Sequence, residues 1–279
     1  MRPGRRTLVA LAMGAATPAV AALPASIARI EAESGGRLGV AVLDTGTGAT
    51  AGHRLAERFP MTSTFKLPLA AAILARGDHS RRVRFTREDL IAWSPVTERR
   101  VGGEGMTLAE LAEATTTTND NTAANLLLRA LGGPGALTAF LRETGDDTTR
   151  LDRIEPELNE ALPGDARDTT TPAAMVSTLQ RLCLGAALTW DARATLLGWM
   201  RANQTGGPLL RAGLPPDWVV GDRTGAGGFH SRAVVAISWP PAGRAPLLVA
   251  AFLHEGPAAM PARDAIFARL GAAIAKAAP

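Results

Sequence analysis

The sequence predicts an α/β (α+β) chain in which an all-helical segment interrupts a domain built on an antiparallel sheet. Strand patterns lie near both ends, the stretch between them is mostly helical, and its 279 residues (46% hydrophobic, 20% charged) allow a large core. We expect a discontinuous α/β domain (22–62 and 205–279) and an all-α domain (63–204) that includes an irregular loop at 150–168. A small-molecule site is expected in the cleft between them.

The N-terminal part predicts one helix and a hairpin. Residues 24–34 have a helical pattern with Ile27 and Ile30 on one side. The apolar run 38–44 predicts a strand, the glycine-containing segment 45–48 a turn, and a second strand leads to 59–60.

Helix-period apolar positions then recur in segments that often start at Thr, Ser or Asp, the preferred N-cap residues. The expected helices are 63–75, 107–116, 122–130, 135–143, 171–182 and 190–201. Residues 150–168 are rich in charge and proline and lack periodicity. Strands return at 218–222, 233–239 and 247–254, before a closing helix at 262–277.

The first 21 residues have the pattern of a secretory signal peptide. Arg2, Arg5 and Arg6 precede an apolar run at 8–16, and small residues follow at 19–21. The run is shorter than the roughly 20 residues that span a bilayer, so no membrane anchor is expected. We expect a secreted or periplasmic protein, and the Arg5-Arg6 pair leaves twin-arginine export open beside the general route.

Charge and composition exclude several function classes. Residues 1–21 contain three arginines and no acidic residue, so the net charge of +4 falls to +1 when they are removed. The remaining sequence has no run of lysines and arginines interleaved with aromatic residues, so nucleic-acid binding is not expected. The single cysteine, Cys183, is expected in the core, and the four scattered histidines predict neither a zinc site nor a histidine-dependent triad.

Ser63-Thr64-Phe65-Lys66, followed by an apolar run, is the most informative stretch. Residues three apart share one helix face, which would place the Ser63 hydroxyl beside the Lys66 amine. A serine attacks poorly until a neighbour takes its proton, and a lysine whose pKa is lowered by burial can do so. Alone, the pattern also fits an ordinary helix start with a solvated lysine.

Three further motifs follow in order. The first, 118–121 (Thr-Asn-Asp-Asn), opens a helix and by itself fits a capped turn. The second places Glu155 and Asn159 four apart in a proline-containing loop, where they can position a water. The third ends a β-run with Arg223, Thr224 and Gly225, a cation, a hydroxyl and a glycine that suit a carboxylate ligand and a close backbone approach.

Together these motifs resemble the serine β-lactamases and penicillin-binding proteins, in the order Ser-x-x-Lys, Ser-Asp-Asn-like and Lys-Thr-Gly-like. The Glu-Pro-Glu-Leu-Asn segment at 155–159 narrows the resemblance to class A β-lactamases, and it extends over nearly all of the mature chain. The resemblance implies the serine β-lactamase and penicillin-binding-protein fold, an antiparallel sheet flanked by helices beside an all-α domain. It also implies hydrolysis of a β-lactam substrate and antibiotic resistance, with no metal or cofactor. We expect a monomer.

The resemblance also implies residue roles. Ser63 would be the acylated nucleophile, Lys66 a base or proton relay, and Glu155 with Asn159 would hold the water that hydrolyses the acyl-enzyme. Which base serves acylation, the lysine or the glutamate through water, stays open. The backbone N–H groups of Ser63 and Ala226 would form the oxyanion hole.

For substrate binding, the resemblance assigns Asn121 to the side-chain amide, and Arg223 and Thr224 to the carboxylate, with Arg232 as an added cation. Trp93 occupies the place of the family's usual tyrosine, where we favour stacking on substrate over a packing role.

The resemblance assigns a structural role as well. Arg153 and Asp168 would close the loop by a salt bridge, and the family's Glu155-Pro156 bond is cis.

Two departures bear on activity. Arg223 replaces the usual lysine, as in the carbenicillin-hydrolysing branch, which implies a penicillinase profile including carboxypenicillins. Asn119 replaces a serine whose hydroxyl passes a proton to the departing lactam nitrogen, and an amide cannot relay a proton. Either protonation goes through water or Lys66 at reduced rate, which we favour, or the enzyme is weak or shifted in substrate. A D,D-peptidase or esterase and a non-catalytic penicillin-binding relative remain the alternatives.

Overall fold

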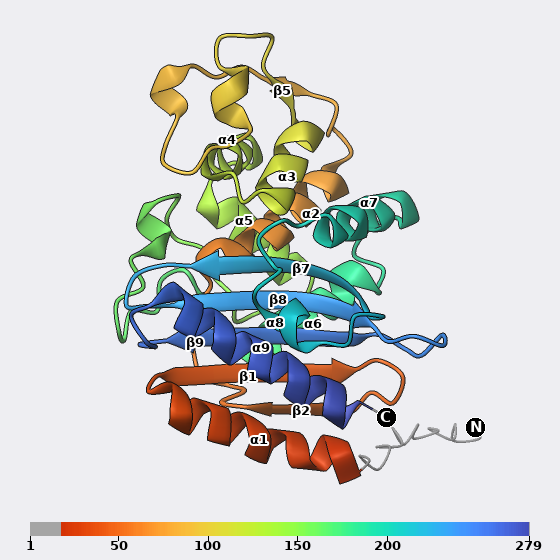
Figure 1. The fold of residues 1–279 in the computed structure, drawn as a ribbon. Coiled ribbons are helices and arrows are strands. Elements are labelled where there is room, and N and C mark those ends of the chain that lie inside the picture. The colour runs from red at the N-terminus through yellow and green to blue at the C-terminus, as the bar shows by residue number, and fades with distance from the viewer. Residues whose placement is uncertain (1–17, 279) are drawn as a thin grey trace, which may run out of the picture.

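The computed structural model describes residues 18–278 (Figure 1). Most of the expected signal peptide, residues 1–17, lies outside the described residues, and residues 18–21 begin helix α1 (Pro18–Ser34). Within residues 18–278, every helix is too short or too polar to cross a membrane.

A five-stranded antiparallel sheet is the centre of the fold, in the order β2-β1-β9-β8-β7. Its strands come from both ends of the chain: β1 (Arg37–Asp44), β2 (Thr50–His53), β7 (Val219–Ala226), β8 (Arg232–Trp239) and β9 (Leu247–His254). Pairing of β1 with β9 joins the N-terminal hairpin to the C-terminal strands. The long helical segment is therefore inserted between strands of one sheet, and Figure 1 shows it lying mainly beyond β7.

Both faces of the sheet are buried because side chains alternate between two cores. In β8, Val234 and Ala236 belong to the core formed with α1 and α9 (Met260–Ala277). Val235 and Ile237 belong to the larger core shared with the helical segment. Covering both faces explains why these antiparallel strands have continuous apolar sequences rather than polar alternation.

The helical segment surrounds α2 (Lys66–Arg76), in which every residue from Lys66 to Leu74 is buried. The other helices are α3 (Leu108–Thr117), α4 (Asn121–Leu131), α5 (Pro134–Glu143), α6 (Pro172–Cys183), α7 (Trp190–Arg201) and the short α8 (Leu210–Gly213). Threonine N-caps accept from backbone N–H groups at α3, α6 and α7, as the sequence predicts. Short strands β3 (Phe59–Pro60) with β6 (Thr169–Thr170), and β4 (Arg82–Val83) with β5 (Met106–Thr107), form two small ribbons.

Four expected elements differ in detail. Ser63 lies in a 3-10 turn, η1 (Thr62–Phe65), before α2 rather than inside an α-helix. The second N-terminal strand is split, since β2 pairs with β1 whereas β3 pairs with β6. Strand β7 continues through Ala226 because its whole length pairs with β8. Helix α1 starts before Pro24, which lies inside it.

Candidate active site

Ser63 lies where η1 passes strand β7. Its side chain is buried, with 4% of the residue exposed. A Cβ added at Gly225 would lie 2.9 Å from the Ser63 nitrogen and 2.1 Å from the Thr62 Oγ1 atom. Only glycine lets the strand approach the serine backbone this closely. The Ser63 hydroxyl donates to Glu155 Oε1 at 3.3 Å.

Lys66 is fully buried and is surrounded by oxygen atoms. Its Nζ lies 3.0 Å from Glu155 Oε1, 2.8 Å from Asn119 Oδ1 and 3.1 Å from the Asn119 carbonyl oxygen. It also donates to Asn121 Oδ1. An ammonium has three donors and no acceptor, so four oxygen acceptors around one nitrogen favour the charged form of this lysine.

Two cations of this site, Lys66 and Arg223, have lowered pKa values. Burial lowers the pKa of Lys66 to about 8; the nearby Arg223 charge adds to this shift, whereas Glu155 opposes it. Burial likewise lowers the pKa of Arg223 to about 10. A lysine with a pKa near 8 can exchange a proton at physiological pH.

Glu155 is fixed by Asn125 and Asn159. The Asn125 side chain accepts from the Glu155 N–H at 2.9 Å and donates to the Glu155 carbonyl at 2.8 Å. The Asn159 amide donates to Glu155 Oε2, and its own Oδ1 is a buried atom without a hydrogen-bond partner within residues 18–278. The bond from Glu155 to Pro156 is cis. A carboxylate beside a free amide oxygen is a suitable place for one water.

Residues 119–121 form a part of the site that contacts Lys66. Asn119 has a left-handed backbone, with φ of 66°, which asparagine adopts more readily than most residues. Asp120 is fully buried and caps α4, and it also accepts from the backbone N–H groups of Val96 and Thr97. Asn121 donates to the Ala92 carbonyl at 2.9 Å, so its amide is held at both ends. Asp120 therefore positions its two neighbours against Lys66.

The predicted carboxylate-binding residues gather along β7 and β8. Thr224 Oγ1 lies 2.6 Å from Thr205 Oγ1. Arg232 Nε donates to Asp264 at 2.7 Å. Arg223 is fully buried, and each of its three guanidinium nitrogens donates to a protein oxygen, including the Thr116 carbonyl at 2.8 Å. Arg223 therefore places a positive charge beside the site, while its N–H groups are bonded to oxygen atoms of the protein.

The site thus contains the buried hydroxyl of Ser63, the Glu155 carboxylate bonded to it and the Lys66 amine with its lowered pKa. These are the components of serine acyl transfer. The sequence matches the β-lactamase enzyme family over residues 22–278. It is 47% identical over 264 residues to β-lactamase L2 of Stenotrophomonas maltophilia, covering 92% of this chain and 87% of that protein. The chain belongs to the class A β-lactamases.

Further comparisons agree with this assignment. The enzyme is 48% identical over 231 residues to the carbapenem-hydrolyzing β-lactamase KPC of Klebsiella oxytoca, covering 81% of this chain and 78% of that one. Among solved structures, an ancestral class A β-lactamase (GNCA) is 57% identical, with a TM-score of 0.90, and covers 92% of this chain and 100% of its own. The expected serine β-lactamase fold is confirmed, and the protein hydrolyses β-lactams, an activity that gives antibiotic resistance.

Trp93 lies on the surface of this β-lactamase, with 62% of the residue exposed and φ of 62°. Its indole Nε1 donates to the Thr118 carbonyl at 3.1 Å, and its own carbonyl accepts from Asn121 N at 2.9 Å. The ring is thus tied to the segment that carries Asn119 while most of its surface faces solvent.

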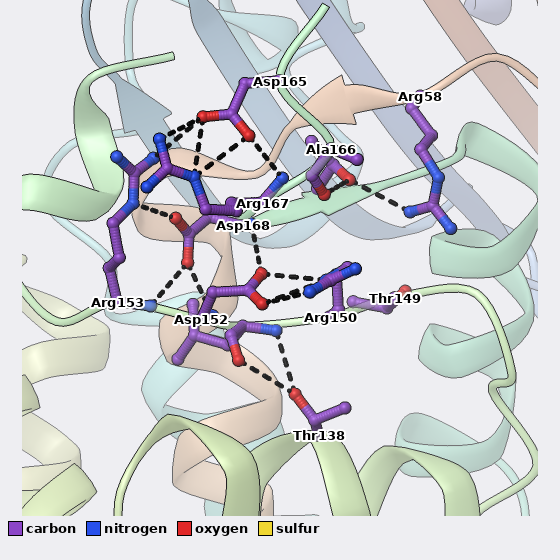
Figure 2. Close-up of polar contacts among 12 residues, drawn as sticks. Arg58, Thr138, Thr149, Arg150, Asp152, Arg153, Asp165, Ala166, Arg167 and Asp168 are labelled. Atoms are coloured by element: carbon purple, nitrogen blue, oxygen red, sulfur yellow. Dashed lines mark hydrogen bonds and ion pairs between the residues drawn. The ribbon is translucent and has the colours of Figure 1, made fainter. Parts of the chain in front are cut away.

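The loop that carries Glu155 is closed at its neck by charged residues (Figure 2). Arg153 Nε lies 2.6 Å from Asp168 Oδ2, and Asp168 Oδ1 also accepts from the backbone N–H groups of Asp152 and Arg153. Around this pair, Arg150 contacts Asp152, and Arg167 contacts Asp165. The neck therefore joins both ends of the loop, as the resemblance implies for Arg153 and Asp168.

Sequence reasoning missed two supporting residues, Asn125 and Asp120. Asn125 lies four residues after Asn121 and so shares its face of α4. The polar face that Asn121, Asn125 and Arg129 form at four-residue spacing was the available signal. Asp120 was visible only as a cap, and its bonds to Val96 and Thr97 depend on the fold.

Proposed function

We propose that Ser63 opens the lactam ring with Glu155 as the base and Lys66 as the acid. The Ser63 oxygen bonds to the lactam carbonyl carbon while its proton passes to Glu155, and the carbon–nitrogen bond then breaks. The Lys66 ammonium delivers a proton to the departing nitrogen, and a proton transfer from Glu155 restores Lys66. The single observation that carries this proposal is the hydrogen bond from Ser63 to Glu155 at 3.3 Å, with Lys66 bonded to the same carboxylate oxygen.

In the second half of the reaction, Glu155 activates a water held with Asn159. The water oxygen attacks the ester carbon while one water proton goes to Glu155. The bond from that carbon to the Ser63 oxygen then breaks, and Glu155 returns the proton to this oxygen, which restores the Ser63 hydroxyl and the carboxylate. The unpartnered Asn159 Oδ1 supports this role, since a buried acceptor gains free energy from a water donor. The backbone N–H groups of Ser63 and Ala226 stabilise the negative charge on the carbonyl oxygen in both steps.

For substrate, we propose a penicillinase profile that includes carboxypenicillins, with modest cephalosporin turnover. Thr224 and Arg232 bind the carboxylate, Arg223 contributes mainly its charge, Asn121 bonds the side-chain amide and Trp93 stacks on the substrate. The exposed indole supports the last role, because a packing residue would be covered. Similar turnover of benzylpenicillin and carbenicillin is expected, and a carbenicillin rate near background would refute this profile.

For the unusual Asn119, we propose that Lys66 takes over the proton transfer at reduced rate. Asn119 Oδ1 accepts from Lys66 at 2.8 Å, so the asparagine holds the ammonium beside the leaving group without carrying a proton itself. Asn119→Ser should restore a hydroxyl relay and accelerate acylation in single-turnover kinetics. An unchanged rate would mean that this position does not limit the chemistry.

We also propose that residues 1–21 direct export, by the general or the twin-arginine route, and that the mature enzyme is a monomer. The support for export is the sequence pattern alone. The N-terminal sequence of protein recovered from the periplasm should begin at about residue 22, and light scattering should give the monomer mass.

Turnover of nitrocefin and benzylpenicillin by purified protein tests the mechanism, with Glu155→Ala as the acyl-trapping variant. The wild type should turn over without a persistent adduct. Glu155→Ala should lose at least about 10²-fold in kcat and accumulate one covalent penicillin, visible by intact mass. Acylation also slows, but the strained ring still opens, whereas deacylation loses its base.

Two other results would identify other functions. A stable penicillin adduct on the wild type would indicate a D,D-peptidase or esterase, because deacylation would then be missing. Absence of an adduct with any β-lactam, together with absence of turnover, would indicate a non-catalytic relative.

A further inference from the structure

We propose that His254, outside the catalytic cluster, is a positioning residue for deacylation, which it serves by holding the loop that carries Asn159. His254 is the last residue of β9 and is 2% exposed. Its Nε2 lies 2.8 Å from the carbonyl oxygen of Ala161, a residue of the loop 150–168. The inference rests on the proposed roles of Glu155 and Asn159.

The ring can make this contact in one way only. A carbonyl oxygen accepts, so Nε2 carries the hydrogen and donates to Ala161. The other nitrogen, Nδ1, is buried without a hydrogen-bond partner within residues 18–278 and lies 3.7 Å from the Glu255 carboxylate. A buried nitrogen without a hydrogen-bond partner is unfavourable. The bond from Nε2 to Ala161 is therefore the polar contact that this buried imidazole provides.

Three consecutive loop residues contact either the turn between β7 and β8 or the end of β9. The Asn159 carbonyl accepts from Gly228 N at 2.8 Å, and a Cβ added at Gly228 would lie 2.2 Å from the Glu160 carbonyl oxygen. Ala161 has φ of 54°, a strained value for a residue with a side chain, and its carbonyl meets His254. The His254 bond therefore contributes to holding Ala161 in a conformation that is unfavourable for a residue with a side chain.

The contact acts on Asn159 more than on Glu155. Ala161 is two residues from Asn159, whose amide donates to the catalytic carboxylate. Glu155 is held independently, because Asn125 bonds its backbone on both sides and Lys66 bonds its side chain. Loss of the His254 bond should displace the water-binding amide and leave acylation nearly intact.

A matched pair of variants tests this role. In His254→Gln the amide nitrogen extends about as far as Nε2, whereas in His254→Asn the same group stops near the position of Nδ1. Acylation and deacylation by benzylpenicillin are measured separately, by stopped flow and by decay of the adduct in intact-mass spectra. Rates are counted per acylated site, so that unfolded protein does not contribute.

We expect His254→Asn to slow deacylation about tenfold, with acylation changed less than about twofold, because a small displacement of a positioned group has effects of this size or larger. kcat and KM should then fall together while kcat/KM is preserved. His254→Gln should recover most of the deacylation rate. Glu255→Gln, which leaves the Nε2 bond intact, should match the wild type.

Other outcomes overturn the inference. They are wild-type deacylation in His254→Asn, an equal loss in both steps, or failure of His254→Gln to recover when its circular dichroism is native. Failure of the proposed mechanism is distinguishable, because the wild-type enzyme would then show no acyl-enzyme or would never release it.

Discussion

Two clusters of charged residues contact the loop 150–168, and they handle protons differently. The catalytic cluster of Lys66, Glu155 and Arg223 is fully buried, and burial lowers the pKa values of both cations. At the neck, hydrogen bonding to Asp152 raises the pKa of Arg150, and hydrogen bonding to Arg167 lowers the pKa of Asp165 to about 2.

The difference lies in solvent exposure rather than in residue type. Where pairs remain partly hydrated, each partner strengthens the charge of the other and the ions stay fixed. Where water is excluded, desolvation outweighs pairing, and a lysine reaches a pKa at which protons move. We therefore propose that the neck serves stability and that the buried cluster serves chemistry, and three experiments can test this division.

The largest expected effect concerns the most buried ion pair of the neck. Asp168→Asn keeps an oxygen for the two backbone N–H groups but turns an amide N–H group toward Arg153 Nε. The other guanidinium nitrogens of Arg153 keep their contacts with Glu160 and Asp165. We expect a loss of about 2 kcal/mol in the free energy of unfolding, since a charged hydrogen bond is lost and two donors then face each other at a buried position. Urea denaturation measures it, and a loss well below 1 kcal/mol would show that this pair resembles the exposed pairs around it.

The next effect concerns the pH dependence of acylation. Lys66 has a pKa of about 8, and in the proposed mechanism it acts as an ammonium acid, so its active form would be complete below that pH and lost above it. The single-turnover acylation rate should be nearly constant between about pH 6 and pH 8 and fall about tenfold per unit well above pH 8. A rate that instead rises through this range would identify the neutral amine as the base for Ser63.

The smallest effect concerns an exposed neck pair. Arg150→Gln removes the contact with Asp152, but Asp152 still accepts from the backbone N–H of Asp168. The expected change in the free energy of unfolding is below about 1 kcal/mol, with kcat unchanged, because exposed ion pairs contribute little. A larger loss would show that the outer charges of the neck act as one network with Asp168.

The sequence predicted most of the architecture, because helix periodicity and strand patterns are local. The helices 107–116 and 190–201 lie within a residue of α3 and α7. Ser63, Lys66 and Glu155 were identified from ordered motifs, and the structure brings them into contact across 92 positions of chain. Their chemical roles remain predictions.

The remaining features depend on contacts distant in sequence. The extension of β7 through Gly225 follows from pairing with β8, against the low strand propensity of glycine. The contact of His254 with Ala161 joins residues 93 positions apart, so a lone histidine at a strand end carried no signal of it. The burial of Arg223 donors among backbone carbonyls was equally invisible in the Arg-Thr-Gly motif.

The single cysteine of the chain gives the enzyme an internal reporter. Cys183 ends α6 with 1% of its surface exposed, and burial raises the pKa of its thiol to about 12, as expected for a core residue. A thiol-reactive dye can label it only after α6 separates from the core. Labelling rates therefore measure how often the folded enzyme opens, without introducing any probe by mutation.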